Sequence, residues 1–192
     1  MKNNNLINPK EQLDLAREHY NNHDYQRALE CIEFSIKSDA VNKNVWLLKG
    51  EIFREMSRLN EAIECFQKAI KIDKLFFEAY IANCAAYMAM GDGKNAGKCV
   101  DEAIKIHSRS SYAYAWKGLV AQTLGQYSTA IASYNKAIRY EKGENTAHIR
   151  TNMGDALFKL ERYEEALDYY ATAANLDKID TGPLIGMASI FL

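Results

Sequence analysis

Four cysteines are the residues of this chain best suited to chemistry, either as metal ligands or as a disulfide framework. Three of them, Cys31, Cys65 and Cys99, follow one another at intervals of 34 residues. Equivalent residues of packed helical copies lie roughly 10 Å apart, which exceeds the ~7 Å limit for a disulfide. No Cys-x-x-Cys pair occurs, and no histidine stands at ligand spacing from a cysteine. The spacing therefore predicts free structural thiols in a reducing compartment, and no metal site.

A glycine-rich stretch from Gly91 to Cys99 is superficially similar to a phosphate-binding loop. Such a loop needs glycine where this chain has Asp92, and serine or threonine where it has Cys99. We interpret the stretch as a turn followed by the start of a helix. The histidines are scattered, and neither Gly-x-Ser-x-Gly nor His-Glu-x-x-His occurs. We therefore expect no catalytic residue, no enzyme activity and no cofactor.

Composition narrows the class of partner. The chain has 24 basic and 25 acidic residues, for a formal net charge of −1, and no segment is markedly basic. A phosphate-binding surface normally shows a basic stripe, so nucleic acid is disfavoured. No apolar run approaches the ~20 residues that cross a bilayer, and the asparagine-rich start lacks the apolar core of a secretory signal. We expect a cytoplasmic protein that binds neither nucleic acid nor membrane.

The elements that carry these residues repeat along the chain. Alanines recur at intervals of 34 residues, with a final interval of 36, at Ala28, Ala62, Ala96, Ala130 and Ala166. A second column follows the same period at Ile36, Ile70, Ile104 and Ile138. Within one copy the apolar residues fall at steps of three, four and seven, which is a helical period. A repeat of this length predicts one supersecondary unit stacked along an axis, with each copy burying an apolar face against its neighbours.

The second copy identifies the kind of repeat. It contains Trp46-x-x-Lys49-Gly50-x-x-Phe53, followed by Ala62-x-x-x-Phe66. This pattern resembles the tetratricopeptide-repeat (TPR) signature. The resemblance implies an all-α fold, a right-handed superhelical solenoid of antiparallel helix pairs, with five TPR units and a partial sixth.

The boundaries of the array follow from the period and from local chemistry. Asn8-Pro9-x-Glu11 supplies a cap residue, a first-turn proline and an acidic third residue, so the first helix should begin at Pro9. Residues 1–8 are expected to be a flexible segment, and an insertion near Gly143 precedes the fifth copy. A single array is expected over 9–192, with copies at 9–42, 43–76, 77–110, 111–144 and 147–180 and a partial copy at 181–192.

The resemblance also implies a binding surface, because the first helix of each TPR copy lines a concave groove that holds a partner peptide or helix. Transferred column by column, this groove includes Leu47, Leu48, Glu51, Arg54, Ile81, Ala85, Met88, Tyr112, Trp116, Leu119 and Asn152. Its middle is apolar, and it lacks the Lys, Asn and Arg clamp with which some family members hold two carboxylates. We therefore predict an apolar or amphipathic partner segment. The alternative is that some of these residues pack against neighbouring first helices.

The last residues leave two further alternatives open. Leu184 to Leu192 has almost no polar side chain, whereas the end of a repeat array is normally polar. Either the chain self-associates through this segment as a structural module, or it is a regulatory or targeting fragment of a larger protein. A third interpretation is that the segment simply covers the fifth copy and leaves some apolar atoms exposed.

Overall fold

The computed structural model describes residues 8–141 and 146–191, and it is entirely helical over them, apart from the turns that join the helices. The flexible segment predicted at 1–8, apart from Asn8, the insertion near Gly143 and the terminal Leu192 lie outside the described residues. The helices in the described part are α1 Pro9–Asn21, α2 Tyr25–Ser38, α3 Lys43–Glu55, α4 Leu59–Ile72, α5 Phe77–Ala89, α6 Gly93–Ile106, α7 Ser111–Thr123, α8 Tyr127–Tyr140, α9 Ala147–Lys159, α10 Tyr163–Leu176 and α11 Gly182–Ile190. The all-α fold class is confirmed.

The helix boundaries agree with the predicted period. The first helices of copies two to five begin at Lys43, Phe77, Ser111 and Ala147, the first residue predicted for each copy. At the start of α1, the Asn8 side chain accepts the backbone N–H of Lys10, and the Asn8 N–H donates to Glu11 Oε2 at 3.4 Å. This capping box fixes the first turn of α1, which begins at Pro9 as expected.

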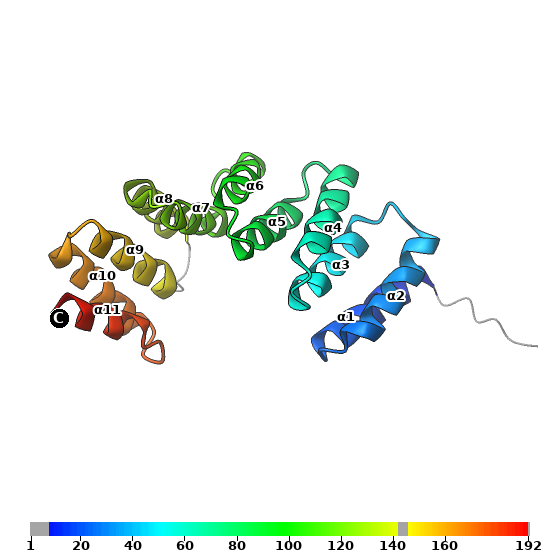
Figure 1. Cartoon of the computed structure of the whole chain (residues 1–192), viewed down its shortest axis with the longest axis horizontal. Helices are drawn as coiled ribbons and strands as arrows, with labels where there is room; N and C mark the ends of the chain where they lie inside the picture. The colour runs from blue at the N-terminus through cyan, green and yellow to red at the C-terminus, as the bar shows by residue number, and fades with distance from the viewer. Residues whose placement is uncertain (1–7, 142–145, 192) are drawn as a thin grey trace, which may run out of the picture. The chain divides into compact units, whose positions relative to one another are not determined.

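The chain divides into two compact units, Met1–Gly91 with α1 to α5 and Asp92–Leu192 with α6 to α11. The division falls between the two helices of the third copy, where the sequence analysis placed no boundary. Within the described part of each unit, helices that touch are neighbours in the chain or are separated by a single helix. Figure 1 shows the helices of the first, second, fourth and fifth copies lying side by side in pairs.

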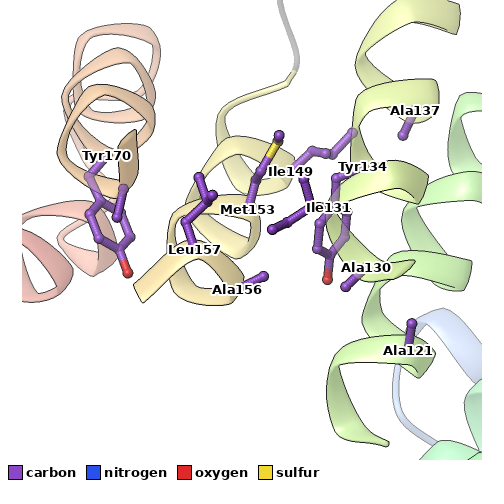
Figure 2. Packing of buried hydrophobic residues seen from close by; sticks show 11 residues of the cluster. Ala121, Ala130, Ile131, Tyr134, Ala137, Ile149, Met153, Ala156, Leu157 and Tyr170 are labelled. Carbon is purple, nitrogen blue, oxygen red and sulfur yellow. The ribbon is translucent and has the colours of Figure 1, made fainter. Parts of the chain in front are cut away.

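An aromatic ring packed on a glycine closes three of these pairs. A Cβ atom added at the glycine would lie within 2.6 Å of the ring in every case, so no larger residue fits there without movement. The ring-and-glycine pairs are Phe66 with Gly50, Tyr134 with Gly118 and Tyr170 with Gly154. Figure 2 shows Tyr134 and Tyr170 within the core cluster of the second unit. These close contacts hold the first helix of a copy against the second.

The turn between the two helices of every copy contains one residue with positive φ. The five positions have φ between 58° and 76° and follow the repeat period, at His23, Ser57, Gly91, Gly125 and Glu161. Only glycine adopts this left-handed conformation without steric cost. Three copies therefore place an unfavourable residue at a turn whose geometry the flanking helices impose.

Candidate functional site

The first helices of the fourth and fifth copies enclose a pocket of about 190 Å³ in the second unit. Its lining comes from α7 and α9 and consists of Tyr112, Ala115, Trp116, Leu119, His148 and Asn152. We call it the Trp116 pocket. The pocket brings together four residues that the sequence analysis assigned to a partner surface: Tyr112, Trp116, Leu119 and Asn152. Most of the lining is apolar.

Helical spacing explains how α7 presents this lining. Tyr112, Trp116 and Leu119 are separated by four and three residues, so they lie on one face of the helix. The Tyr112 and Trp116 rings meet edge to face, with centroids 6.4 Å apart and planes at 89°. The start of α7 is fixed by Ser110, whose hydroxyl accepts the backbone N–H of Ala113. Tyr112 is 58% exposed although it contacts another aromatic ring.

In the first unit, the structure corrects two of the predicted surface residues. Leu48 and Ile81 are each only 5% exposed, so they are packing residues and offer no accessible surface. Leu48 belongs to a core cluster with Leu13 and Ala16 of α1, which shows that this side of α3 faces the first copy. For Leu48, the alternative interpretation is therefore correct: it packs against the first helix of the neighbouring copy.

The other predicted residues of the first unit are half-buried. Leu47 packs against the core formed by α3, α4 and α5, and Ala85 and Met88 are partly covered on α5. Glu51 and Arg54 are half-buried on α3, and Arg54 Nη2 lies 2.9 Å from Glu55 Oε1. The partly accessible residues of this set are therefore a mixture of apolar and charged side chains, whereas the lining of the Trp116 pocket in the second unit is mostly apolar.

Burial perturbs the ionisable groups of this set. It raises the pKa of the Glu51 carboxyl, and the nearby Arg54 and Arg17 oppose that rise. Burial also raises the pKa of the Tyr20 hydroxyl, helped by the negative charges of Glu51 and Glu55. The cause of both shifts is the partial burial of these side chains of α1 and α3.

A second pocket of the second unit contains polar side chains of α7 and α9, which the column-by-column transfer also assigned to the groove. It has a volume of about 330 Å³ and is lined by Gln122, Asp155, Phe158, Lys159 and Tyr170, with Gly182, Ile185, Gly186 and Ser189 from α11. We call it the Asp155 pocket. Tyr170 Oη donates to Asp155 Oδ1 at 2.7 Å, and Tyr134 Oη donates to Gln122 Oε1 at 2.9 Å. The sequence gives one indication of these hydrogen bonds. At the position whose ring packs on the glycine, the fourth and fifth copies have tyrosine, whereas the second copy has phenylalanine.

The comparisons with known proteins bear directly on the family. Sequence models described as tetratricopeptide repeat match residues 13–74 and 111–179. The chain belongs to the tetratricopeptide-repeat family. The prediction from the Trp46 and Ala62 motifs is thus confirmed. The family assignment makes this TPR protein, in general terms, a protein-interaction scaffold, and the TPR fold is typically non-catalytic.

Solved structures share the fold of this TPR protein. A MamA crystal structure is 23% identical over 88% of this chain and 92% of its own, with a TM-score of 0.76. A thermophilic TPR protein of Thermus thermophilus is 21% identical, covers 96% of this chain and 99% of its own, and has a TM-score of 0.73. YrrB, described as a TPR protein with an unusual peptide-binding site, is 15% identical over 96% of this chain and 94% of its own, with a TM-score of 0.75. None of the curated proteins compared with the chain matches it significantly.

The four cysteines of this TPR protein form no disulfide bond. Burial raises the pKa of the Cys65 and Cys99 thiols to about 11 each, so both carry a proton at neutral pH. Among the residues that the structure describes, no group of three or more His, Cys, Asp or Glu side chains is placed to hold a metal ion. None of the described helices combines the length and apolarity needed to cross a membrane.

The stretch that is similar to a phosphate-binding loop has a purely structural explanation. Asp92 is the N-cap of α6, and its Oδ1 accepts the backbone N–H of Asn95 at 3.0 Å. This hydrogen bond also lowers the pKa of the Asp92 carboxyl. The interpretation as a turn and helix start is confirmed.

Proposed function

We propose that this TPR protein binds an apolar or amphipathic segment of a partner protein in the Trp116 pocket. The observation that carries the proposal is the meeting of Tyr112, Trp116 and Leu119 around a hollow of about 190 Å³. Large rigid aromatic side chains are the residues most often responsible for binding energy at protein interfaces. A hollow of this size accommodates a large apolar side chain of the partner rather than a whole cofactor.

Two further observations support the proposal. The solved structure of YrrB has the same fold and is described as having a peptide-binding site. The first unit has a separate mixed surface on α3, formed by Glu51, Arg54 and the half-buried Leu47, which suits an amphipathic segment. We propose Ala85 and Met88 as further contacts of this first-unit surface. The four cysteines form no disulfide bond, which also suits the cytoplasmic location predicted from the sequence.

Selection from a displayed library of random dodecapeptides on the full chain tests this function. The affinities of the selected peptides are then measured by fluorescence anisotropy for the wild type, Tyr112→Ala, Trp116→Ala and Phe34→Ala. Phe34 is a matched control because it is an aromatic residue, 41% exposed on α2 of the first unit, and lines neither pocket. We expect Trp116→Ala to weaken binding by about tenfold or more, and Phe34→Ala to leave it unchanged. Peptides that bind all variants equally would refute the proposal.

A second candidate function is self-association through α11. Three apolar side chains of this segment, Leu184, Ile185 and Phe191, are 54%, 64% and 77% exposed. A second copy of the chain could bury them, because apolar patches of this kind favour association. Sedimentation equilibrium distinguishes the two functions: a mass that rises with concentration and returns to the monomer value in Leu184→Glu supports self-association. A constant monomer mass excludes it.

A further inference from the structure

Two buried tyrosines of the second unit fix the polar groups on one side of the core. Tyr134 and Tyr170 are 0% and 1% exposed, and each ring packs on a glycine of the preceding helix. Their hydroxyls donate to Gln122 Oε1 and to Asp155 Oδ1. Figure 2 shows both hydroxyl oxygens pointing to the same side of the cluster. Immobile rings thus position an amide and a carboxylate on α7 and α9.

The Asp155 pocket continues the Trp116 pocket along the same two helices. Gln122 follows Leu119 by three residues on α7, and Asp155 follows Asn152 by three residues on α9. Three residues of helix correspond to about 4.5 Å along the axis. One peptide can therefore reach both pockets with neighbouring residues of an extended segment, or with residues three or four apart on a helix.

The carboxylate in the Asp155 pocket has unused binding capacity. Tyr170 donates one hydrogen bond to it, whereas an ionised carboxylate accepts about four. None of the ion pairs formed by the described residues of this unit includes Asp155. The single lysine of the lining, Lys159, is exposed one turn further on, with Nζ 5.8 Å from the Phe158 ring centroid. Burial and the Asp155 charge raise the pKa of the Tyr170 hydroxyl, which therefore keeps its proton and remains a donor.

We propose that the Asp155 pocket binds a lysine or arginine side chain of the same partner segment whose apolar side chain enters the Trp116 pocket. This inference rests on the proposed function and defines its ligand as an apolar residue with a cationic residue nearby. Asp155 supplies the charge and Gln122 an additional polar contact. Tyr170 is a positioning residue, because it acts through Asp155.

The second copy shows that a ring without a hydroxyl fits at the position of Tyr170. Phe66 occupies the ring column of the second copy and packs on Gly50 as Tyr170 packs on Gly154. Tyr170→Phe should therefore keep the ring packing and the fold while releasing the Asp155 carboxylate. Asp155→Asn removes the negative charge but keeps an oxygen that accepts from Tyr170.

The test uses the full chain and the random dodecapeptide selection described above. We expect the selected peptides to carry lysine or arginine within four residues of a large apolar residue. For one such peptide and its norleucine analogue, binding is measured to the wild type, Asp155→Asn, Asp155→Lys and Tyr170→Phe. Asp168→Asn is the matched control, since Asp168 is an α10 carboxylate outside both pockets. Circular dichroism and the urea midpoint establish that each variant is folded.

We expect Asp155→Asn to weaken binding of the cationic peptide by about tenfold and to leave the norleucine analogue unchanged. Asp155→Lys should reverse the preference in favour of a peptide with glutamate at the same position. Tyr170→Phe should reduce discrimination between lysine and norleucine, an effect that a purely structural tyrosine would not produce. Asp168→Asn should change none of these affinities.

Two results overturn the inference, and they differ from each other. Selected peptides that need Trp116 but lack cationic residues, or that bind Asp155→Asn as well as the wild type, refute the Asp155 pocket and leave the proposed function intact. Recovery of no peptide, or of peptides indifferent to Trp116→Ala, refutes the proposed function and this inference with it.

Discussion

Replacing Gly118 with alanine is the sharpest test of the idea that ring-and-glycine contacts hold the helix pairs together. A Cβ atom at this position would lie 2.3 Å from Cε1 and 2.5 Å from Cδ1 of Tyr134, whose side chain is fully buried. Carbon atoms are in favourable contact at about 3.5–4.0 Å, so the ring or α7 must move by roughly 1 Å. Such a movement also disturbs the Tyr134 hydrogen bond to Gln122.

The expected change in the free energy of unfolding combines two effects that lower it and one that raises it. Overpacking of a well-packed core costs typically about 1–3 kcal/mol, and weakening one buried hydrogen bond adds about 1 kcal/mol. Alanine returns about 1 kcal/mol, because it is the better helix former. We therefore expect Gly118→Ala to lower the free energy of unfolding by about 1–3 kcal/mol. In urea, the unfolding midpoint should fall by roughly 1 M.

Gly97 provides a matched control on the neighbouring helix α6. A Cβ atom there would meet only Val120 Cγ1, at 3.7 Å, which is an ordinary contact. Gly97→Ala should therefore raise the free energy of unfolding by about 0.5–1 kcal/mol through helix propensity alone. The same chemical change thus has opposite expected signs at two helical positions in one unit.

The assay is urea unfolding followed by far-ultraviolet circular dichroism, with comparison of midpoints and slopes. A midpoint for Gly118→Ala at or above that of the wild type would refute the reasoning. A double-mutant cycle with Tyr134→Leu identifies the ring as the cause, because the cost of Gly118→Ala should shrink by at least about 1 kcal/mol once the ring is gone.

Three further predictions concern turns, thiols and surface ion pairs. Ser57 and Gly125 stand at turns with φ of 60° and 72°, a conformation that glycine adopts at less cost than other residues. Ser57→Gly should therefore raise the free energy of unfolding by about 1 kcal/mol, and Gly125→Ala should lower it by a similar amount. Urea midpoints that move in the same direction in both variants would contradict this. The folded-state pKa of the Cys65 and Cys99 thiols is about 11, so iodoacetamide should alkylate them slowly in the native protein at neutral pH and faster as the pH rises toward that value. In urea the reaction should be fast, and peptide mass spectrometry follows it in both conditions. Rapid alkylation of the native protein at neutral pH would show that the thiols are accessible and ionised. Glu61→Ala and Arg162→Ala break the exposed pairs of these residues with Arg58 and Glu165, and the midpoint of thermal unfolding should hardly change in either variant, because exposed ion pairs contribute little to stability; a marked fall of the midpoint would contradict this.

The repeat register was predictable from sequence because its determinants are local and recur. Gly50 and Phe66 lie in one helix pair, and the same two columns return as Gly118 with Tyr134 and as Gly154 with Tyr170. Helix starts then follow from the period alone.

The binding surface was harder to predict, because consecutive helical residues point about 100° apart. Leu47 and Leu48 were both assigned to the surface, yet Leu48 packs on α1 and Leu47 packs toward α4 and α5. The apolar character that suggested a partner for Leu48 is explained by a neighbouring helix. Which side of α3 the first copy covers depends on the helix crossing, and the sequence period does not encode that crossing.

The hydrogen bonds that organise the Asp155 pocket were not predicted, for a related reason. Gln122 and Asp155 appear in the sequence as ordinary polar residues of first helices. Their significance comes from the hydroxyls of Tyr134 and Tyr170, which reach them across the helix pair. The division of the chain at Gly91 likewise has no local sequence marker, since Gly125 stands at the equivalent turn of the next copy.

The locality of the helix contacts has a consequence for how the protein forms. In the described part of each unit, every helix touches only neighbours within two positions along the chain. The contact order is therefore low, and chains of this kind fold rapidly because little loop-closure entropy opposes each step. During synthesis, a helix pair can make almost all its contacts once about two further copies have left the ribosome. The array can therefore fold while the chain is still being made. Force applied to the ends should likewise extend the chain in steps of about one repeat, rather than in a single rupture.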